Sequence, residues 1–220
     1  MNTLKLKQKI RPYYHFLKNF RNTVLMRPYW GHMAMTAQLD GRVRKDMAPK
    51  IFMYEHTAIL GRRTTFIISP VGEGGRFIMK KYAGASSGMT VITGNHAVFP
   101  QVGKWCRDGM ADHLEDEDKD VIVEEDVWIG ANVTLMPGVV VGRGSIIGAG
   151  SVLRSSVPPY SIIAGNPAKV VGFKFTPEEV IAHEKALYPE AERLPIELLE
   201  KNYNKYFISR IKEIKQFTKL

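Results

Sequence analysis

The feature that most constrains the fold of this chain is an aliphatic side chain at every sixth residue. The series runs through Val123, Ile129, Leu135, Val141, Ile147 and Leu153. Four positions after each of these stands a small or β-branched residue, in the order Val127, Val133, Val139, Ser145, Ser151 and Val157. Neither a helix, with a period of about 3.6, nor a strand, with a period of about 2, produces an unbroken period of six. The period therefore predicts a solenoid of short strands joined by tight corners.

In this interpretation each group of six residues supplies one strand and one corner. The aliphatic side chain points toward the axis, and a glycine or small residue lets the chain turn without a steric clash. Three groups make one coil of about 18 residues, and coils stack at the spacing of neighbouring strands, about 4.8 Å. The period of six continues less clearly upstream, at Met79, Ala85 and Val91. Residues 50–70 are rich in strand-forming residues, but the period cannot be followed through them. We predict an all-β solenoid over residues 50–172.

The remaining segments are predicted to be a loop and two helical ends. The period stops between Asn95 and Val121, so residues 97–120 should leave the coil as a loop, and loops of this length in compact domains are often functional. Residues 1–49 are predicted to form a basic, largely helical segment. Residues 173–220 should form helices, the first starting at the Thr-Pro-Glu-Glu of Thr176 as a capping box. A second should follow Pro195, and helices at both ends would cover unpaired strand edges.

Charge and composition narrow the possible partners and the compartment. The formal net charge is +9, but residues 1–30 carry Lys and Arg without Asp or Glu, whereas residues 111–120 are acidic. No nucleic-acid-binding motif accompanies the basic ends, so we expect no nucleic acid; an anionic membrane face or a phosphorylated ligand fits the charge equally well. A single cysteine excludes a disulfide scaffold and fits a reducing compartment. We expect a cytoplasmic protein and leave open peripheral contact of the basic N-terminus with the inner membrane face.

Residues 126–172 resemble the hexapeptide-repeat acyltransferases, which fold as left-handed parallel β-helices. The resemblance lies in VWIG, PGV, IGAGSVL, VPPY and AGNPAK, in that order. ITGNH at 92–96, followed by a loop, is similar to the branch of xenobiotic, galactoside, maltose and polysaccharide O-acetyltransferases. The resemblance implies an acetyl-CoA-dependent O-acetyltransferase that modifies a hydroxyl of a sugar or glycan, for example in polysaccharide biosynthesis. It also implies a homotrimer, whose neighbouring subunits complete the coenzyme A groove, and no metal.

The resemblance also implies roles for particular residues. His96 would be the general base that deprotonates the acceptor hydroxyl as it attacks the thioester directly, without a covalent enzyme intermediate. Histidine titrates near pH 6.5, which suits this task, and such a base contributes about 10²–10⁴ in rate. A backbone N–H of Gly130 or Ala131 would stabilise the oxyanion. Asn95 and Trp128 would bind the acceptor, although packing at a coil corner explains Trp128 equally well.

Coenzyme A is expected to lie along the solenoid near Ala131 and Ala149, whose small side chains allow a close approach. Its phosphates would be met by Lys169 and by Arg154, which stands where relatives often have a lysine. The group that orients the His96 ring is left open between the acidic residues of the loop and backbone carbonyls.

Other functions stay open at this point. An N-acyltransferase that modifies an amino sugar would use the same base, and an antibiotic-modifying acetyltransferase is favoured by the ITGNH pattern alone. A non-enzymatic alternative is a trimeric β-helix scaffold that binds an anionic membrane or a partner. A zinc carbonic anhydrase on the same fold would need three converging imidazoles, and His56, His96 and His113 lack matched places in the repeat.

Overall fold

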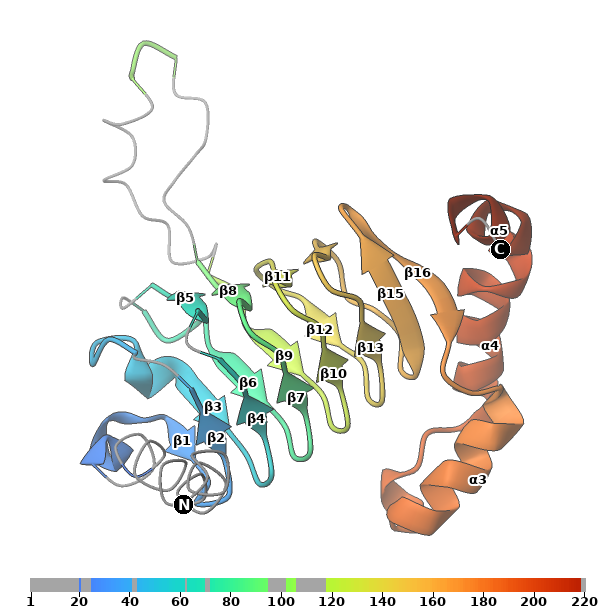
Figure 1. The fold of residues 1–220 in the computed structure, drawn as a ribbon, viewed down its shortest axis with the longest axis horizontal. Helices are drawn as coiled ribbons and strands as arrows, with labels where there is room; N and C mark the ends of the chain where they lie inside the picture. The colour runs from blue at the N-terminus through green and yellow to red at the C-terminus, as the bar shows by residue number, and fades with distance from the viewer. Residues whose placement is uncertain are drawn as a thin grey trace, which may run out of the picture.

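The computed structural model describes residue 20 and residues 25–40, 43–61, 63–69, 72–94, 102–105 and 118–218. These residues wind into a solenoid whose coils stack along one long axis, with the C-terminal helices at one end (Figure 1). Three sheets run along the axis, and we call them A, B and C in the order in which a coil visits them. Each coil gives each sheet at most one short strand, so strands that are neighbours in space are far apart in the sequence.

The strands of each sheet follow in spatial order. Sheet A consists of β1 (His32–Met33), β3 (Ile51–Met53), β6 (Phe77–Met79), β9 (Val121–Val123) and β12 (Val140–Val141). Sheet B consists of β2 (Gln38–Leu39), β4 (Ala58–Ile59), β7 (Gly84–Ala85), β10 (Trp128–Ile129), β13 (Ile146–Ile147), β15 (Ser161–Gly165) and β16 (Ala168–Phe173). Sheet C consists of β5 (Thr65–Ile67), β8 (Thr90–Ile92), β11 (Thr134–Leu135) and β14 (Val152–Leu153). All of these pairs are parallel except β15 with β16, which closes sheet B as an antiparallel hairpin.

The period of six is confirmed as the repeat that builds the core. The six aliphatic residues of the series are all buried. Val123 pairs with Val141, Ile129 with Ile147 and Leu135 with Leu153, so each sheet sends one column of side chains into the axis. Two serines at the small positions are also buried and donate hydrogen bonds to backbone carbonyls, Ser145 to Pro158 and Ser151 to Gly148. These bonds satisfy hydroxyls that would otherwise be costly to bury.

The solenoid begins nearer the N-terminus than the predicted boundary at residue 50. Strands β1 and β2 lie within the segment expected to be helical, and they pair with β3 and β4. Met33 and Leu39, six residues apart, are buried, and they extend the core columns of sheet A and sheet B respectively. Residues 1–19 and 21–24 of the segment predicted to be helical lie outside the described residues. Farther along it, Arg27–Tyr29 and Ala48–Lys50 form the short 3-10 helices η2 and η3.

The phase fails over residues 50–79 because the chain carries extra residues there. Phe66 pairs with Val91 in sheet C, so it occupies the place that an uninterrupted period from Ile59 would give to residue 65. A longer connection then joins β5 to β6 before the regular phase resumes at Met79. Single-residue insertions at corners leave the sheets intact, but they disrupt any periodicity that is read from the sequence.

The corners between the sheets also form columns along the axis. At corner BC, which joins sheet B to sheet C, Gly88, Asn132 and Gly150 all have positive φ, the left-handed conformation that tight turns require. Corner CA, which joins sheet C to the next strand of sheet A, contains Gly138 with φ of 80°. Corner AB includes Tyr82, with φ of 61°.

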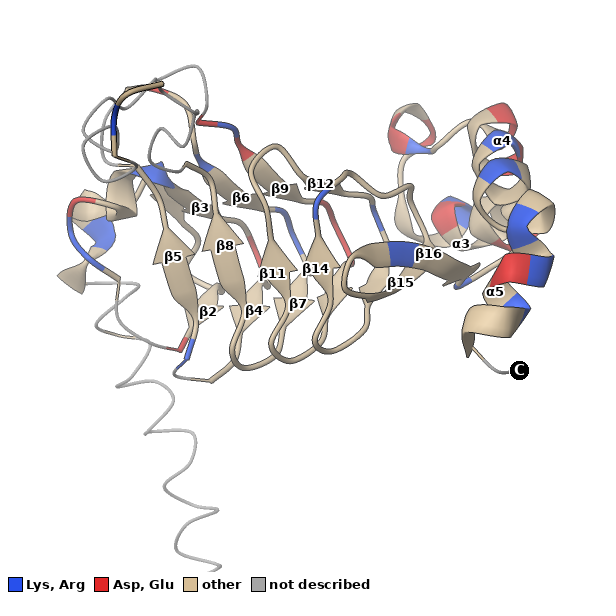
Figure 2. Ribbon diagram, turned by 90° about the horizontal axis from the view of Figure 1, so that it is seen from above, with Lys and Arg blue, Asp and Glu red and all other residues tan. Residues whose placement is uncertain are grey.

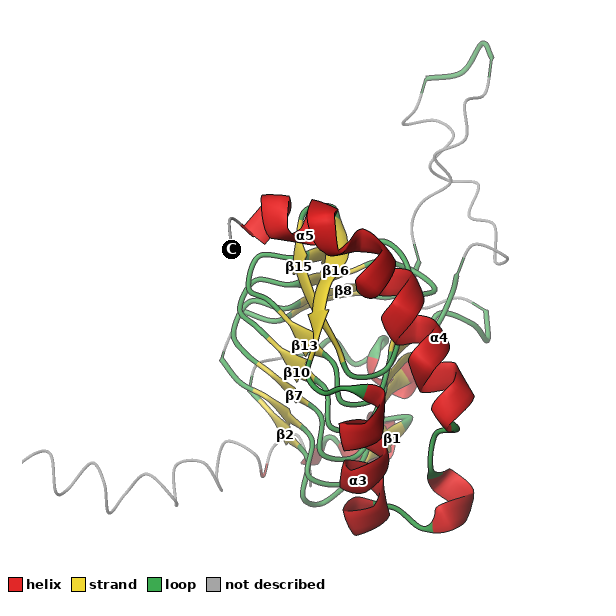
Figure 3. Ribbon diagram, turned by 90° about the vertical axis from the view of Figure 1, so that its right-hand side faces the viewer, coloured by secondary structure: helices red, strands yellow, loops and turns green. Residues whose placement is uncertain are grey.

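The C-terminal helices lie across the end of the solenoid (Figure 3). Helix α3 (Pro177–Leu187) starts at the predicted capping box, in which the Thr176 hydroxyl and the Glu179 carboxylate bond to each other's backbone N–H. Helix α4 (Ile196–Tyr206) follows Pro195 as predicted, and α5 (Ile211–Thr218) is separated from it by the 3-10 helix η6 (Ile208–Arg210). The turn between α3 and α4 contains η5 (Glu190–Glu192). Of the helices in the described part of the chain, none has the length and apolar character that a membrane crossing requires.

Candidate functional site

The two ends of the predicted loop meet at corner CA, beside β8 and β9. The Lys119 N–H donates to the carbonyl of Thr93 at 2.8 Å, which joins the return of the loop to its departure. The Asp118 carboxylate lies directly against Gly94, so a side chain at Gly94 would collide with it. His96 and Asn95, the predicted base and acceptor-binding residue, lie outside the described residues. The structure does define their point of attachment, because Gly94 is buried on the solenoid.

Arg76 and Asp120 strengthen this attachment. The Asp120 carboxylate accepts hydrogen bonds from the Arg76 backbone N–H at 2.8 Å and from its Nε at 2.9 Å, and it also contacts the guanidinium NH2 group. Partial burial of Asp120 opposes ionisation, but the Arg76 hydrogen bonds outweigh that effect and lower its pKa. Sequence reasoning did not find this pair, because the two residues come together only when neighbouring coils stack.

The residues predicted near the oxyanion and coenzyme A come together at corner BC. Gly130 donates its N–H to the carbonyl of Ile147 at 2.8 Å, and the carbonyl of Ala131 accepts from Gly150 at 2.8 Å. A β-carbon at Gly130 would lie 2.7 Å from the backbone nitrogen of Ala149, so only glycine fits between these coils. The Ala131 N–H makes no hydrogen bond to any residue that the structure describes. Of the two predicted oxyanion donors, Ala131 therefore has the available N–H.

Trp128 stands three residues before this corner, on the outer face of sheet B. Its ring lies over the adjacent strand β7, where a β-carbon at Gly84 would be 3.0 Å from two ring carbons. The side chain is nevertheless 48% exposed. Trp128 thus packs on the neighbouring coil and also presents a free aromatic surface. Both the packing role and the acceptor-binding role are compatible with this position.

The two predicted phosphate cations differ in their surroundings. Lys169, on β16, forms an ion pair with Glu213 of α5 at 3.0 Å. Hydrogen bonds from Arg210 and Lys169 lower the pKa of Glu213 to about 2. Arg154, which follows β14, is exposed and makes no ion pair within the described part of the chain. In this structure Arg154 therefore makes no ion pair with a described residue, while Lys169 and Arg210 share the carboxylate of Glu213.

The loop attachment and corner BC lie at opposite ends of sheet C. A strand of this sheet runs from one corner to the other, for example from Gly88 through β8 to Gly94. Six residues of extended chain span on the order of 15–20 Å. The Asn132 N–H bonds to the carbonyl of Ser87, which places Ala131 beside the beginning of that strand. The predicted site residues of one subunit thus fall into two groups, at two different corners.

Charged residues lie mainly outside the strands (Figure 2). The described strands of all three sheets up to β15 contain no Lys, Arg, Asp or Glu. Their outward positions carry residues such as Thr90, Thr134, Ile146 and Val152. Charged residues instead gather beside sheet A and on the C-terminal helices.

Comparison with known proteins agrees with this architecture. Residues 120–155 match the family model described as bacterial transferase hexapeptide (six repeats). A probable macrolide acetyltransferase of Lysinibacillus sphaericus is 52% identical over 61 residues, which are 28% of this chain and 34% of that protein. A putative lipopolysaccharide biosynthesis O-acetyl transferase, WbbJ, of Escherichia coli K12 is 46% identical over 55 residues, 25% of this chain and 28% of that protein.

A solved structure extends the likeness to most of the fold. The hexapeptide-repeat acetyltransferase of Vibrio cholerae, in complex with acetyl coenzyme A, superposes with a TM-score of 0.54 over 70% of this chain and 76% of that chain, at 22% identity. The segments shared with the two curated relatives span only about a third of their lengths. Residues 120–155 therefore carry the hexapeptide repeat of bacterial transferases, and the chain has the left-handed parallel β-helix fold of the Vibrio cholerae structure.

Proposed function

We propose that this protein transfers an acetyl group from acetyl-CoA to a hydroxyl of a sugar or glycan. The observation that carries the proposal is the 52% identity over 61 residues to a probable acetyltransferase. The fold is also that of a Vibrio cholerae acetyltransferase that binds acetyl coenzyme A. The long insertion at corner CA gives the solenoid a place for a reactive group at a rigid edge.

In the proposed reaction His96 accepts the proton of the acceptor hydroxyl while the hydroxyl oxygen attacks the thioester carbonyl carbon. An alcohol is a weak nucleophile until this proton is removed, which is why a positioned base is needed. A carbon–oxygen bond forms, the carbon–sulfur bond breaks, and the proton passes to the departing thiolate. The products are an O-acetyl ester and free coenzyme A, and no acyl-enzyme forms.

Corner BC supplies the other parts of the proposed site. The Ala131 N–H, which has no partner among the described residues, can donate to the oxyanion of the tetrahedral intermediate. Ala149 stacks directly above this turn and has a side chain small enough for a pantetheine arm to pass. At the other end of sheet C, the exposed guanidinium of Arg154 at corner CA is the better of the two cations for a coenzyme A phosphate, because Lys169 is paired with Glu213.

Two observations bear on the acceptor. The half-exposed ring of Trp128 offers a flat apolar face for a sugar ring, and one of the relatives is a putative lipopolysaccharide O-acetyl transferase. A second candidate acceptor is a macrolide hydroxyl, favoured by the similarity to a probable macrolide acetyltransferase.

The test is release of free coenzyme A from acetyl-CoA in the presence of glycans, macrolides or chloramphenicol. We expect His96→Ala to lower kcat by about 10²–10⁴ without changing the KM for acetyl-CoA. His56→Asn is the matched control, because asparagine tolerates the positive φ of that position and should keep full activity. Undiminished turnover of His96→Ala would remove His96 as the base, and turnover with antibiotics alone would favour the second candidate.

We further propose a homotrimer in which each site is shared between two subunits. His96 is two residues from Gly94, and two residues reach at most about 7 Å. Corner BC of the same chain lies a full strand of sheet C away from Gly94, which favours a site completed by Ala131 of a neighbouring subunit. The uncharged outer faces of sheets B and C are available for packing against neighbouring copies.

Mixing two inactive variants tests the shared site. Ala149→Trp should block the donor groove, and we expect trimers reassembled from equal amounts of His96→Ala and Ala149→Trp to regain up to about a quarter of native activity. Ala186→Trp, an exposed alanine on α3, is the control for bulk alone and should stay active. If both groups came from one subunit, every site would retain a defect and mixing would restore nothing.

A further inference from the structure

A second groove lies at corner AB, away from the loop attachment. Its volume is about 420 Å³, within the usual range for small-molecule sites. It is lined by Tyr54, Glu55, Ile78, Lys80, Lys81 and Glu125, which come from three successive coils. Glu125 follows the far end of β9, whereas the loop returns to the solenoid just before the near end of that strand.

Tyr54 gives this groove a fixed aromatic wall. Its ring stacks on His32, with 4.8 Å between centroids and 30° between planes, so one face is covered and the ring is held in place. The side chain remains 38% exposed. A ring that is already immobilised loses little conformational entropy when a ligand packs on it. Ile78, half-buried beside it on β6, adds to the apolar surface.

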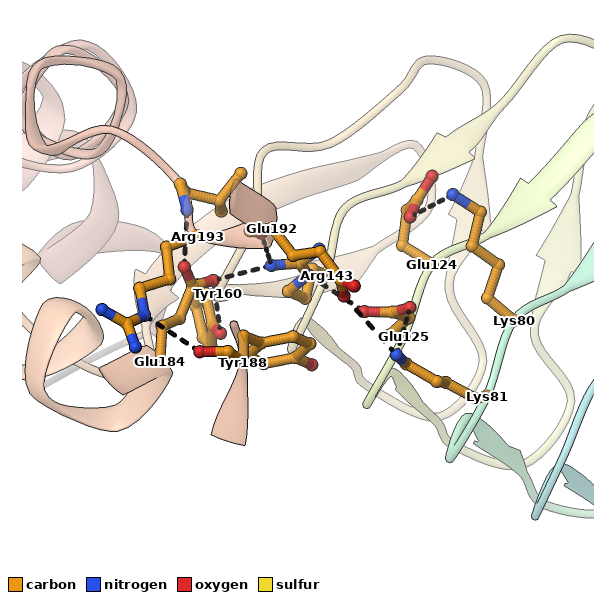
Figure 4. A network of polar contacts seen from close by, with 11 residues as sticks. Lys80, Lys81, Glu124, Glu125, Arg143, Tyr160, Glu184, Tyr188, Glu192 and Arg193 are labelled. Atoms are coloured by element: carbon orange, nitrogen blue, oxygen red, sulfur yellow. Dashed lines mark hydrogen bonds and ion pairs between the residues drawn. The ribbon is translucent and has the colours of Figure 1, made fainter. Parts of the chain in front are cut away.

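The charged side chains that line the groove include equal numbers of lysines and glutamates. Lys80 pairs with Glu124 at 2.9 Å, and Lys81 pairs with Glu125 at 3.4 Å (Figure 4). Glu55 is exposed and makes no ion pair with any described residue, so its carboxylate can accept two or more hydrogen bonds. Two lysines and two glutamates line the groove, and their formal charges cancel.

We propose that this groove binds a neutral saccharide. Such a ligand presents an apolar C–H face that fits the open face of an aromatic ring, whose π-cloud is negative. It also carries hydroxyls that donate to Glu55 and Glu125 and accept from the two lysines. Phosphates and acidic sugars fit less well, because both ammonium groups already face carboxylates. An apolar peptide would cover the Glu55 carboxylate without offering it a hydrogen-bond donor.

Saturation-transfer NMR on the full chain tests the proposal with maltotetraose and tetra-N-acetylchitotetraose as neutral probes and inorganic phosphate as the anionic probe. We expect transfer to ring protons of at least one oligosaccharide in the native protein and in Tyr29→Ala, an equally exposed tyrosine outside the groove. Tyr54→Ala should weaken that affinity at least about tenfold, while Tyr54→Phe, which keeps the ring, should bind like the native protein. Glu55→Gln, a replacement at an exposed position, should weaken the oligosaccharide affinity severalfold. This variant tests the role of the groove if Tyr54→Ala does not fold.

Three results would overturn the proposal. They are an absence of transfer to both oligosaccharides, equal binding by the native protein, Tyr54→Ala and Glu55→Gln, and phosphate binding that displaces the sugars. The outcome does not depend on acetyl transfer, because His96→Ala leaves the groove intact and should bind the same oligosaccharide. A sugar held at the transfer site alone would instead survive Tyr54→Ala.

Discussion

Replacing Glu184 by alanine should release the C-terminal helices from the solenoid. Glu184 lies on α3, its side chain is fully buried, and it is the centre of the network in Figure 4. Its carboxylate accepts hydrogen bonds from the Tyr160 hydroxyl at 3.0 Å, from Arg143 at 3.1 Å and from the Leu194 N–H at 2.6 Å. These donors belong to the solenoid and to the start of the next helical segment, so one side chain joins three parts of the chain.

The expected cost can be worked out from these contacts. Hydrogen bonds to a charged group each contribute about 1.5–3 kcal/mol, and removing one partner of a buried ion pair costs about 3–5 kcal/mol. Arg143 would keep Glu125 at 3.4 Å, the carbonyl of Glu192 at 2.8 Å and the ring of Tyr188 at 4.2 Å. Since the arginine is not left alone, we expect the lower part of the range, about 3–4 kcal/mol of docking free energy.

Hydrogen exchange of the α3 amides measures this loss directly, because it reports the free energy of local opening. At about 1.4 kcal/mol per tenfold change, Glu184→Ala should speed exchange in α3 by two to three orders of magnitude. Glu200→Ala, an exposed glutamate on α4, is the matched control and should change exchange by less than about threefold. A change below tenfold in Glu184→Ala would refute the reasoning, and it would mean that apolar packing alone docks the helices.

Three further predictions concern single contacts. Gly130→Ala should cost about 1–3 kcal/mol in urea denaturation, because its β-carbon would meet backbone of the next coil, whereas Gly172→Ala, whose nearest neighbour would lie at 3.8 Å, should be near neutral. The pKa of Glu213 is lowered to about 2. Its ion pairs should therefore be complete above about pH 4.5 and lost as the pH falls toward 2. A carboxyl NMR titration should show that the pKa of Glu213 rises in Lys169→Met. Burial raises the pKa of Tyr188 to about 12, so its contribution to stability should be present below about pH 10 and lost as the pH rises through 12. Ultraviolet titration should detect a phenol that titrates near this pH and that is absent in Tyr188→Phe.

The part of the fold that repeats could be predicted from the sequence, because one structural rule acts on every coil. The burial of Val123 and of its successors follows directly from the period. The buried positions of the coil around Phe66 could not be assigned from the period. Extra residues at a corner change the spacing along the sequence but leave the stacking of the strands unchanged. The capping box at Thr176 was predictable because all of its atoms lie within four residues.

The sequence suggests which residues could form the candidate site, but it does not predict their surroundings. The stacking of two coils decides that the Gly130 N–H donates to the carbonyl of Ile147, whereas the Ala131 N–H makes no bond to a described residue. The ion pair of Lys169 depends on Glu213, a residue of α5 that is distant in the sequence. The corner AB groove draws its lining from three coils, so no short motif could have indicated it.

The loop insertion itself shows why this scaffold can carry a site. Met79 pairs with Val123 across the insertion in the same register as Val123 pairs with Val141 across a single coil. The core is therefore continuous whether or not a loop leaves it, and the cost of lengthening a loop grows only slowly with its length. The ends of the insertion are fixed by the Lys119–Thr93 hydrogen bond and by Arg76 on Asp120. A loop anchored in this way can vary without disturbing the coils, so in the proposed reaction the acceptor specificity could change while corner BC, one strand of sheet C away, stays the same.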